Sequence, residues 1–205
     1  MTKAAVTAPL SDARRLFWIE AFLTPEKCER ILDELQFAFW APSTVTHYQP
    51  WRTRTERSPV RVSETTSEKW FTPELQRTMR SIDRRLESLV PRFQSRREEW
   101  QATRYPLGGK FDYHLDSGHW SHGSGGYREH TVLIYLNTPR RGGATHFKEL
   151  DVSVRAKTGR LLVWRNMLSR DERDLDMLHA GTPLVAGRKI VLVTWVRQRK
   201  TRKEP

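Results

Sequence analysis

The sequence predicts an α+β fold in which helices come first and short antiparallel strands follow. Two observations carry this prediction: up to about residue 104 the apolar residues recur at helical spacing, and from residue 105 short β-rich runs alternate with glycine. Helices followed by many short strands favour an antiparallel barrel or sandwich supported by helices. A chain of 205 residues, 37% of them hydrophobic, is long enough to form one domain with a real core.

Two supporting helices are expected in the first half. Thr24 followed by Pro25 is typical of a helix start, because threonine caps the first turn and proline fits its first position. The apolar positions that follow at helical spacing are Cys28, Ile31, Leu32 and Leu35. Thr72 and Pro73 repeat the start signal, and Pro91 ends the run. The apolar positions of this second helix are Leu75, Met79, Ile82, Leu86 and Leu89.

The second half reads as strands joined by glycine-rich turns. The expected strands are Phe111 to Leu115, Thr131 to Asn137, Leu161 to Trp164 and Ile190 to Val196. The segment 118–127 (GHWSHGSGGY) is too polar and rich in glycine for a strand, so we expect a mobile loop. We therefore divide a single domain, 1–205, into a flexible start (1–13), a helical support (14–104), the β-structure (105–199) and a basic tail (200–205).

Composition limits the compartment and the partners. The chain has 36 basic and 24 acidic residues, a net charge of +12, which favours an acidic partner. Nucleic acid is not the favoured partner, because no zinc-finger, ribonucleoprotein or basic-zipper pattern accompanies the charge. No run is long and apolar enough for a secretory signal or a membrane span, so we expect a cytoplasmic protein without membrane contact. The lone Cys28 agrees with a reducing compartment and leaves histidines and carboxylates to bind any metal.

Three residues form a candidate metal site. His114 and Asp116 are two apart, and alternation on a strand would turn both side chains to one face. His179, in LHAGTP, would complete a set of two histidines and one carboxylate, which leaves positions open on iron(II) for other ligands. Taken singly, the pair also fits a polar strand end, and the third residue a core histidine.

Lys189 begins the run KIVLVTWV, whose period of two places it on one face with Val191, Val193 and Trp195. Burying an unpaired ammonium group costs several kcal/mol, on the order of the desolvation penalty of an ion, unless an anion meets it. A bound dicarboxylate would supply that anion. The alternative is a lysine at the mouth of the strand that reaches water.

The order of motifs carries a resemblance to a known family. RYPLGGKFDYHLD, REHTVLIYLNTPRRGGATHF, GRLLVWRN and HAGTPLVAGRKIVLVTWVR together resemble the prolyl 4-hydroxylase branch of the iron(II) and 2-oxoglutarate dioxygenases. The likeness covers roughly residues 105–197, and FLTPEKCERIL is similar to the family's leading helix more loosely. It implies that the β-structure is a double-stranded β-helix, or jelly roll.

The resemblance also assigns roles to single residues. It implies that His114, Asp116 and His179 hold the iron and that Lys189 binds the distal carboxylate of 2-oxoglutarate. The residues expected around the cosubstrate are Tyr105, Leu133, Tyr135 and Thr145, and those expected near the substrate are Arg128 and Trp195. Without the resemblance the last two read as a solvated arginine and a core tryptophan. The motifs give no ligand role to His119, His122, His130 and His146.

By this resemblance the chain is a dioxygenase that uses Fe(II), 2-oxoglutarate and O2, with ascorbate as a reductant, to hydroxylate an unactivated C–H bond. The expected substrate is a prolyl residue in a peptide or protein. Three alternatives stay open: a hydroxylase of a free amino acid or of a carrier-bound biosynthetic intermediate, a nucleic-acid dealkylase, and a non-catalytic jelly-roll binding module. The sequence does not predict an oligomeric state.

Overall fold

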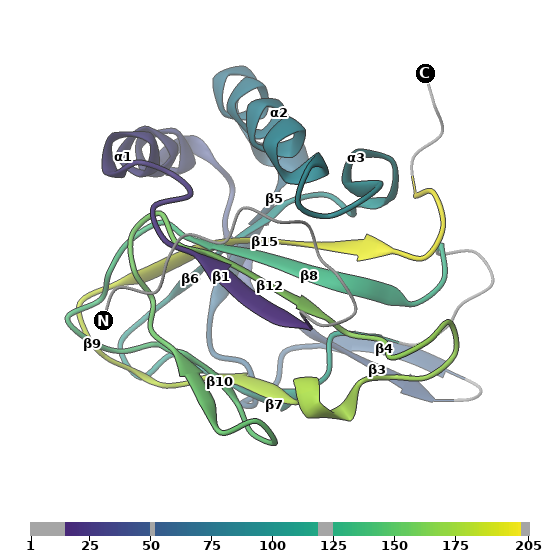
Figure 1. The fold of residues 1–205 in the computed structure, drawn as a ribbon. Coiled ribbons are helices and arrows are strands. Elements are labelled where there is room, and N and C mark those ends of the chain that lie inside the picture. Colours follow the sequence, from purple (N-terminus) through teal and green to yellow (C-terminus); the bar gives the residue numbers. More distant parts are fainter. Residues whose placement is uncertain (1–14, 50–51, 119–124, 202–205) are drawn as a thin grey trace, which may run out of the picture.

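Two antiparallel sheets lie face to face beneath a layer of helices (Figure 1). The computed structural model describes residues 15–49, 52–118 and 125–201. In these residues the larger sheet has the strand order β1 (Leu16–Ile19), β12 (Leu161–Arg165), β8 (Arg128–Tyr135), β15 (Lys189–Arg197), β6 (Gln101–Tyr105), β5 (Glu64–Ser67) and β2 (Ala41–Pro42). The smaller sheet has the order β11 (Val152–Val154), β10 (Thr145–Phe147), β13 (His179–Gly181) and β7 (Phe111–His114). The predicted antiparallel sandwich is confirmed.

Two short strand pairs complete the described β-structure. They are β3 (Val45–Gln49) with β4 (Arg52–Glu56), and β9 (Arg141–Gly142) with β14 (Leu184–Ala186). Single 3-10 turns cover Leu35–Phe37, Glu68–Trp70 and Leu175–Met177.

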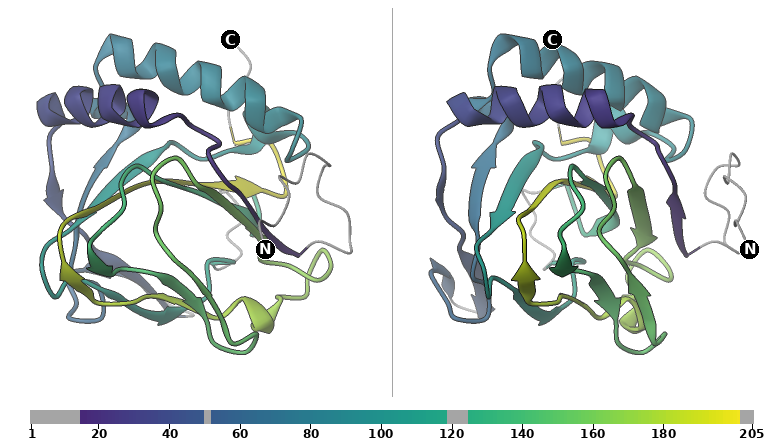
Figure 2. Two further views of the ribbon diagram at one scale, coloured as in Figure 1. Left: turned by 60° about the vertical axis from the view of Figure 1, so that its left-hand side comes forward. Right: turned by 90° about the vertical axis from the view of Figure 1, so that its left-hand side faces the viewer.

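The helices cover the outer face of the larger sheet (Figure 2). They are α1 (Pro25–Glu34), α2 (Pro73–Glu87) and α3 (Phe93–Arg96). Both predicted starts are confirmed, since Thr24 Oγ1 accepts from the Lys27 amide at 3.3 Å and Thr72 Oγ1 accepts from the Leu75 amide at 3.1 Å. These bonds satisfy amides that no turn of the helix can reach. No helix in the described part of the chain is long and apolar enough to span a membrane.

Strand alternation divides the core into two layers. On β8, Val132 and Ile134 belong to the apolar cluster between the sheet and the helices. Tyr135, on the opposite face of the same strand, belongs to the cluster between the two sheets. The larger sheet thus packs on both faces, and the face turned toward the smaller sheet is the one that carries the functional side chains described below.

The first half contributes more β-structure than the helical signals indicate. β1 pairs with β12, and β6 pairs with β15, so strands from 14–104 flank the central strands of the larger sheet. These strands are four or five residues long and do not alternate strictly between buried and exposed positions. Short runs of this kind become strands by pairing with neighbours that the sequence does not reveal.

Three predicted segments fall partly or wholly outside the described residues. The flexible start (1–13) lies outside them, as do residues 119–124 of the predicted loop and residues 202–205 of the basic tail.

Candidate metal centre

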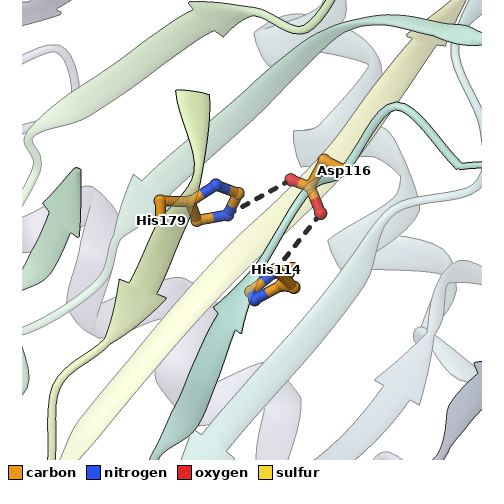
Figure 3. A group of neighbouring side chains, drawn as sticks. All are labelled: His114, Asp116 and His179. Carbon is orange, nitrogen blue, oxygen red and sulfur yellow. Dashed lines mark ion pairs between the residues drawn. The ribbon is translucent and has the colours of Figure 1, made fainter. Parts of the chain in front are cut away.

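The three predicted ligands meet at one point between the sheets (Figure 3). His114 ends β7 and His179 begins β13, and the pairing of these strands sets the two residues opposite each other. The sequence pattern predicted Asp116 on the same strand as His114. In the structure Asp116 instead lies in the turn that follows β7. Its Oδ1 is 3.5 Å from His114 Nε2 and its Oδ2 is 3.6 Å from His179 Nε2. The ligand atoms of all three lie within 4.8 Å of one another.

Hydrogen bonds to the backbone set the tautomer of both imidazoles. His114 Nδ1 is 2.7 Å from the Asp112 carbonyl oxygen, and His179 Nδ1 is 2.8 Å from the Met177 carbonyl oxygen. A carbonyl only accepts, so each Nδ1 carries the proton and each Nε2 keeps its lone pair. Metal-binding histidines are held in this way. The donor set therefore fits a divalent metal bound by two imidazoles and one carboxylate.

Burial and mutual charge give these side chains the protonation states that a metal needs. Burial, together with repulsion from His114, lowers the pKa of His179 to about 4, so this imidazole is neutral at neutral pH. Burial also acts to raise the pKa of Asp116, but its interactions with His179, His114 and Arg128 outweigh burial and lower that pKa. A neutral imidazole beside an ionised carboxylate binds a divalent metal without releasing a proton first.

Lys189 lines the same pocket as the triad. It begins β15, opposite Tyr105 on β6, and its side chain is buried. Its Nζ lies 4.5 Å from the centre of the Tyr105 ring, and it forms no ion pair with the described residues. Burial lowers the pKa of Lys189 to about 7. The alternative of a lysine that reaches water does not hold, because the Lys189 side chain is buried, and no carboxylate of the described residues pairs with it.

Three of the four residues expected around the cosubstrate line this pocket, and Tyr135 does not. Tyr105, Leu133 and Thr145 line it together with the triad and Lys189. Tyr135 is fully buried behind this wall, and its hydroxyl lies 2.6 Å from Thr145 Oγ1. Strand pairing explains the convergence: β6, β8 and β15 are neighbours in the larger sheet, whereas β10 faces them from the smaller sheet.

The two residues expected near the substrate lie at one wall of the pocket. Trp195 lines the pocket and is 8% exposed. The Arg128 guanidinium lies over the Trp195 ring, 3.7 Å from its centre, and forms an ion pair with Glu98. Arg128 is thus held against the pocket wall and is not a solvated arginine.

The sequence reasoning missed Arg61, which also lines the pocket. Its guanidinium lies 4.8 Å from the centre of the Phe111 ring, and Phe111 stacks on His114 at 3.6 Å between ring centres. Arg61 donates to the Thr44 carbonyl and to Thr65 Oγ1, both at 3.2 Å. No pattern distinguishes this arginine from the many solvated arginines of a basic chain, so only its tertiary position reveals it.

His130 and His146 take no part in the metal centre. His146 Nδ1 lies 2.7 Å from the Tyr113 hydroxyl. His130 lies on β8, and burial lowers its pKa to about 4. His119 and His122 lie outside the described residues.

Comparison with known proteins agrees with this geometry. Residues 100–197 match the family model described as the 2OG-Fe(II) oxygenase superfamily. Prolyl 4-hydroxylase subunit alpha-2 of Caenorhabditis elegans is 31% identical over 150 residues, which cover 70% of this chain and 27% of that protein. The chain spans about a quarter of the length of the curated relatives it matches.

Solved structures share the fold. A viral collagen prolyl hydroxylase from Paramecium Bursaria Chlorella virus-1, solved with 2OG, matches with a TM-score of 0.65 at 21% identity, covering 91% of this chain and 97% of that one. A prolyl hydroxylase from Trichoplax adhaerens, solved with a peptide fragment of the hypoxia inducible factor oxygen degradation domain, matches with a TM-score of 0.60 at 18% identity, covering 91% and 85%. The jelly-roll core is therefore confirmed. With its His-Asp-His triad and these likenesses, the chain belongs to the 2OG-Fe(II) oxygenase superfamily, in its prolyl 4-hydroxylase-like branch.

Proposed function

We propose that this chain is an iron(II)- and 2-oxoglutarate-dependent dioxygenase that hydroxylates a prolyl residue in a peptide or protein. One observation carries the proposal: a single pocket is lined both by the metal triad and by the buried Lys189, which forms no ion pair with the described residues. A ligand that chelates a metal with one end and offers a carboxylate at the other satisfies both of these groups, and 2-oxoglutarate has that chemistry.

Each part of the pocket would have a defined task. His114, Asp116 and His179 would hold the iron, and Lys189 would bind the distal carboxylate of 2-oxoglutarate. When bound, iron and 2-oxoglutarate supply the oxidative chemistry: with O2, the cosubstrate becomes succinate and carbon dioxide, and one oxygen atom enters the substrate C–H bond. Leu133, Val191 and Val193 add apolar surface to the lining of the pocket, which limits water there.

A peptide substrate is supported by the relatives and by the aromatic wall of the pocket. The Trichoplax adhaerens structure holds a peptide fragment, and the curated relatives are prolyl 4-hydroxylase subunits. Trp195 offers an apolar ring, and Arg61 and Arg128 lie beside the pocket as hydrogen-bond donors for carbonyl groups of an extended chain. A free amino acid would use little of this wall.

The first test is an anaerobic titration of the iron(II)-loaded protein with 2-oxoglutarate. We expect a weak visible metal-to-ligand charge-transfer band in the wild type and none in His179→Ala. His146→Ala is the matched control, because this imidazole bonds to Tyr113 away from the triad, and it should keep the band. A folded wild type without the band would contradict the proposal and favour a binding module.

The second test identifies the substrate. With iron(II), 2-oxoglutarate, O2 and ascorbate, we expect proline-containing peptides to raise succinate formation above the basal rate and to gain the mass of one oxygen atom. If succinate formation rises only with free amino acids, or only with a methylated oligonucleotide, that compound and not a prolyl peptide is the substrate.

A further inference from the structure

Thr131 occupies the centre of the sheet face that looks onto the metal centre. It lies on β8, fully buried, and its register partners are Trp164 on β12 and Trp195 on β15. Residues paired in this way point to the same face of a sheet, so Thr131 stands between two indole rings that line the pocket. A polar side chain in this row needs a hydrogen-bond partner or carries a desolvation cost.

The Thr131 hydroxyl finds its partners in a short buried chain that ends on a predicted metal ligand. Thr131 Oγ1 donates to Asp116 Oδ2 at 2.8 Å. The Asn166 side-chain amide, just beyond β12, donates to the same Thr131 oxygen at 2.9 Å. Asn166 is 2% exposed and Asp116 is 8% exposed, so water competes little with either bond.

The chemistry of the three groups fixes the direction of this chain. An ionised carboxylate only accepts, so the hydroxyl proton of Thr131 points to Asp116 and its lone pairs are left for Asn166. With the amide reversed, the Asn166 oxygen would compete for that proton. The Thr131 oxygen would then face the carboxylate without a hydrogen between them. The Asn166 amide therefore points its nitrogen to Thr131, although its oxygen Oδ1 has no hydrogen-bond partner among the described residues.

We propose that Thr131 and Asn166 are positioning residues that orient the Asp116 carboxylate for the metal, with Thr131 holding one of its two oxygens and Asn166 holding Thr131. This inference rests on the proposed metal centre and adds to it the residues that hydrogen-bond, directly or through Thr131, to one of the metal ligands. Asp116 needs such a support because it lies in a turn, whereas both histidines start or end a strand and bond to the backbone themselves. Partners that orient a ligand typically change metal affinity by about 10–100-fold when removed.

Metal affinity is the readout that separates this role from a merely structural one. The probe is Co(II) or Mn(II), which resist oxidation, with the dissociation constant measured by chelator competition. We expect Thr131→Val to weaken binding by about 10–100-fold and Thr131→Ser, which keeps the hydroxyl, to stay near the wild type. Asn166→Ala should weaken binding less. Because Asn166 acts through Thr131, the double variant should bind no more weakly than Thr131→Val alone.

Thr194→Val is the matched control. Thr194 is equally buried on β15, and its hydroxyl donates to the Glu98 carbonyl at 2.9 Å, away from the triad. We expect it to bind metal like the wild type. The inference is overturned if Thr131→Val also binds like the wild type, or if Thr194→Val loses as much affinity. If Thr131→Val does not fold, the metal affinity of Asn166→Ala is the deciding measurement. A wild-type metal affinity in Asn166→Ala then overturns the inference. A wild type that binds no metal would overturn the proposed function itself, which is a separate result.

Discussion

Glu98 binds Arg128 with both of its carboxylate oxygens. Oε1 accepts from Arg128 Nε at 2.7 Å and Oε2 accepts from its Nη2 at 2.8 Å. The same Oε1 accepts from Arg197 Nε at 2.7 Å. Because the Arg128 guanidinium lies over the ring of Trp195, Glu98 fixes a charged group at the wall of the pocket without lining the pocket itself.

Glu98→Gln should therefore act on the substrate side of the site. We expect KM for a peptide substrate to rise while the dissociation constant of 2-oxoglutarate stays unchanged, because Lys189 and the triad do not touch Glu98. Glu99→Gln, at an exposed neighbouring position, is the control and should leave both values unchanged. An equal rise in both constants for Glu98→Gln would show a general distortion of the pocket.

The same variant makes a prediction for stability. Burial raises the pKa of Glu98, but Arg128 and Arg197 outweigh it and lower that pKa below its ordinary value. A lowered pKa contributes stability that is present above the unfolded value and is lost as the pH falls through the folded value. Urea unfolding should show Glu98→Gln less stable than the wild type by about 3 kcal/mol at neutral pH. The gap should narrow in acid, and a gap that widened would contradict the assignment.

His114→Ala should abolish iron binding and turnover and leave the protein folded. The imidazole supplies one ligand atom, and its loss leaves only two groups for the metal. Iron retained after gel filtration measures binding, and far-UV circular dichroism checks the fold. Since His146→Ala removes an imidazole of equal size outside the triad, it should retain iron. Normal turnover in His114→Ala would refute the triad.

The affinity for 2-oxoglutarate should fall at alkaline pH because of Lys189. Burial lowers the pKa of this lysine to about 7 in the empty pocket. The charge that binds the carboxylate is therefore present below that value. Above it a proton must be taken up, so the dissociation constant should rise by up to about tenfold per pH unit. Titrations at several pH values, from mildly acidic to mildly alkaline, measure this slope.

Two variants of Lys189 sharpen that measurement. Lys189→Arg keeps its charge throughout this range and should give a flat profile. Lys189→Ala should raise the 2-oxoglutarate requirement at every pH, because it removes a charge-assisted contact. A flat wild-type profile, or an unchanged requirement in Lys189→Ala, would exclude the assigned role.

Leu86→Ala tests the support that the helical layer gives to the larger sheet. Leu86 is fully buried in the cluster between α2 and the sheet, so its truncation should lower the free energy of unfolding by about 2–5 kcal/mol. Chemical denaturation measures this loss. Arg84→Ala, at an exposed position of the same helix, should change it by less than about 0.5 kcal/mol. Similar losses in both variants would contradict this packing.

The sequence by itself determined the two longer helices, the class of fold and the residues of the metal centre, whereas the short helix α3 was not predicted. The helix starts at Thr24 and Thr72 were predictable because capping is local: the side chain bonds an amide three residues away. The ligands and Lys189 were predictable because ordered motifs resemble a family, and because a lysine on an apolar strand face demands an anion.

Only the tertiary structure decided which residues support those ligands. Thr131 and Asn166 are 15 and 50 residues from Asp116 along the chain, and Arg61 lies over the ring of Phe111, which stacks on His114. The edge strand β1 and the inner strand β6 likewise form because β12 and β15 offer them backbone partners. A short stretch of sequence shows the propensity of its residues for helix or strand and the alternation of apolar and polar positions. Contacts between distant strands depend on register and on sheet order, which a single sequence does not encode in any short window.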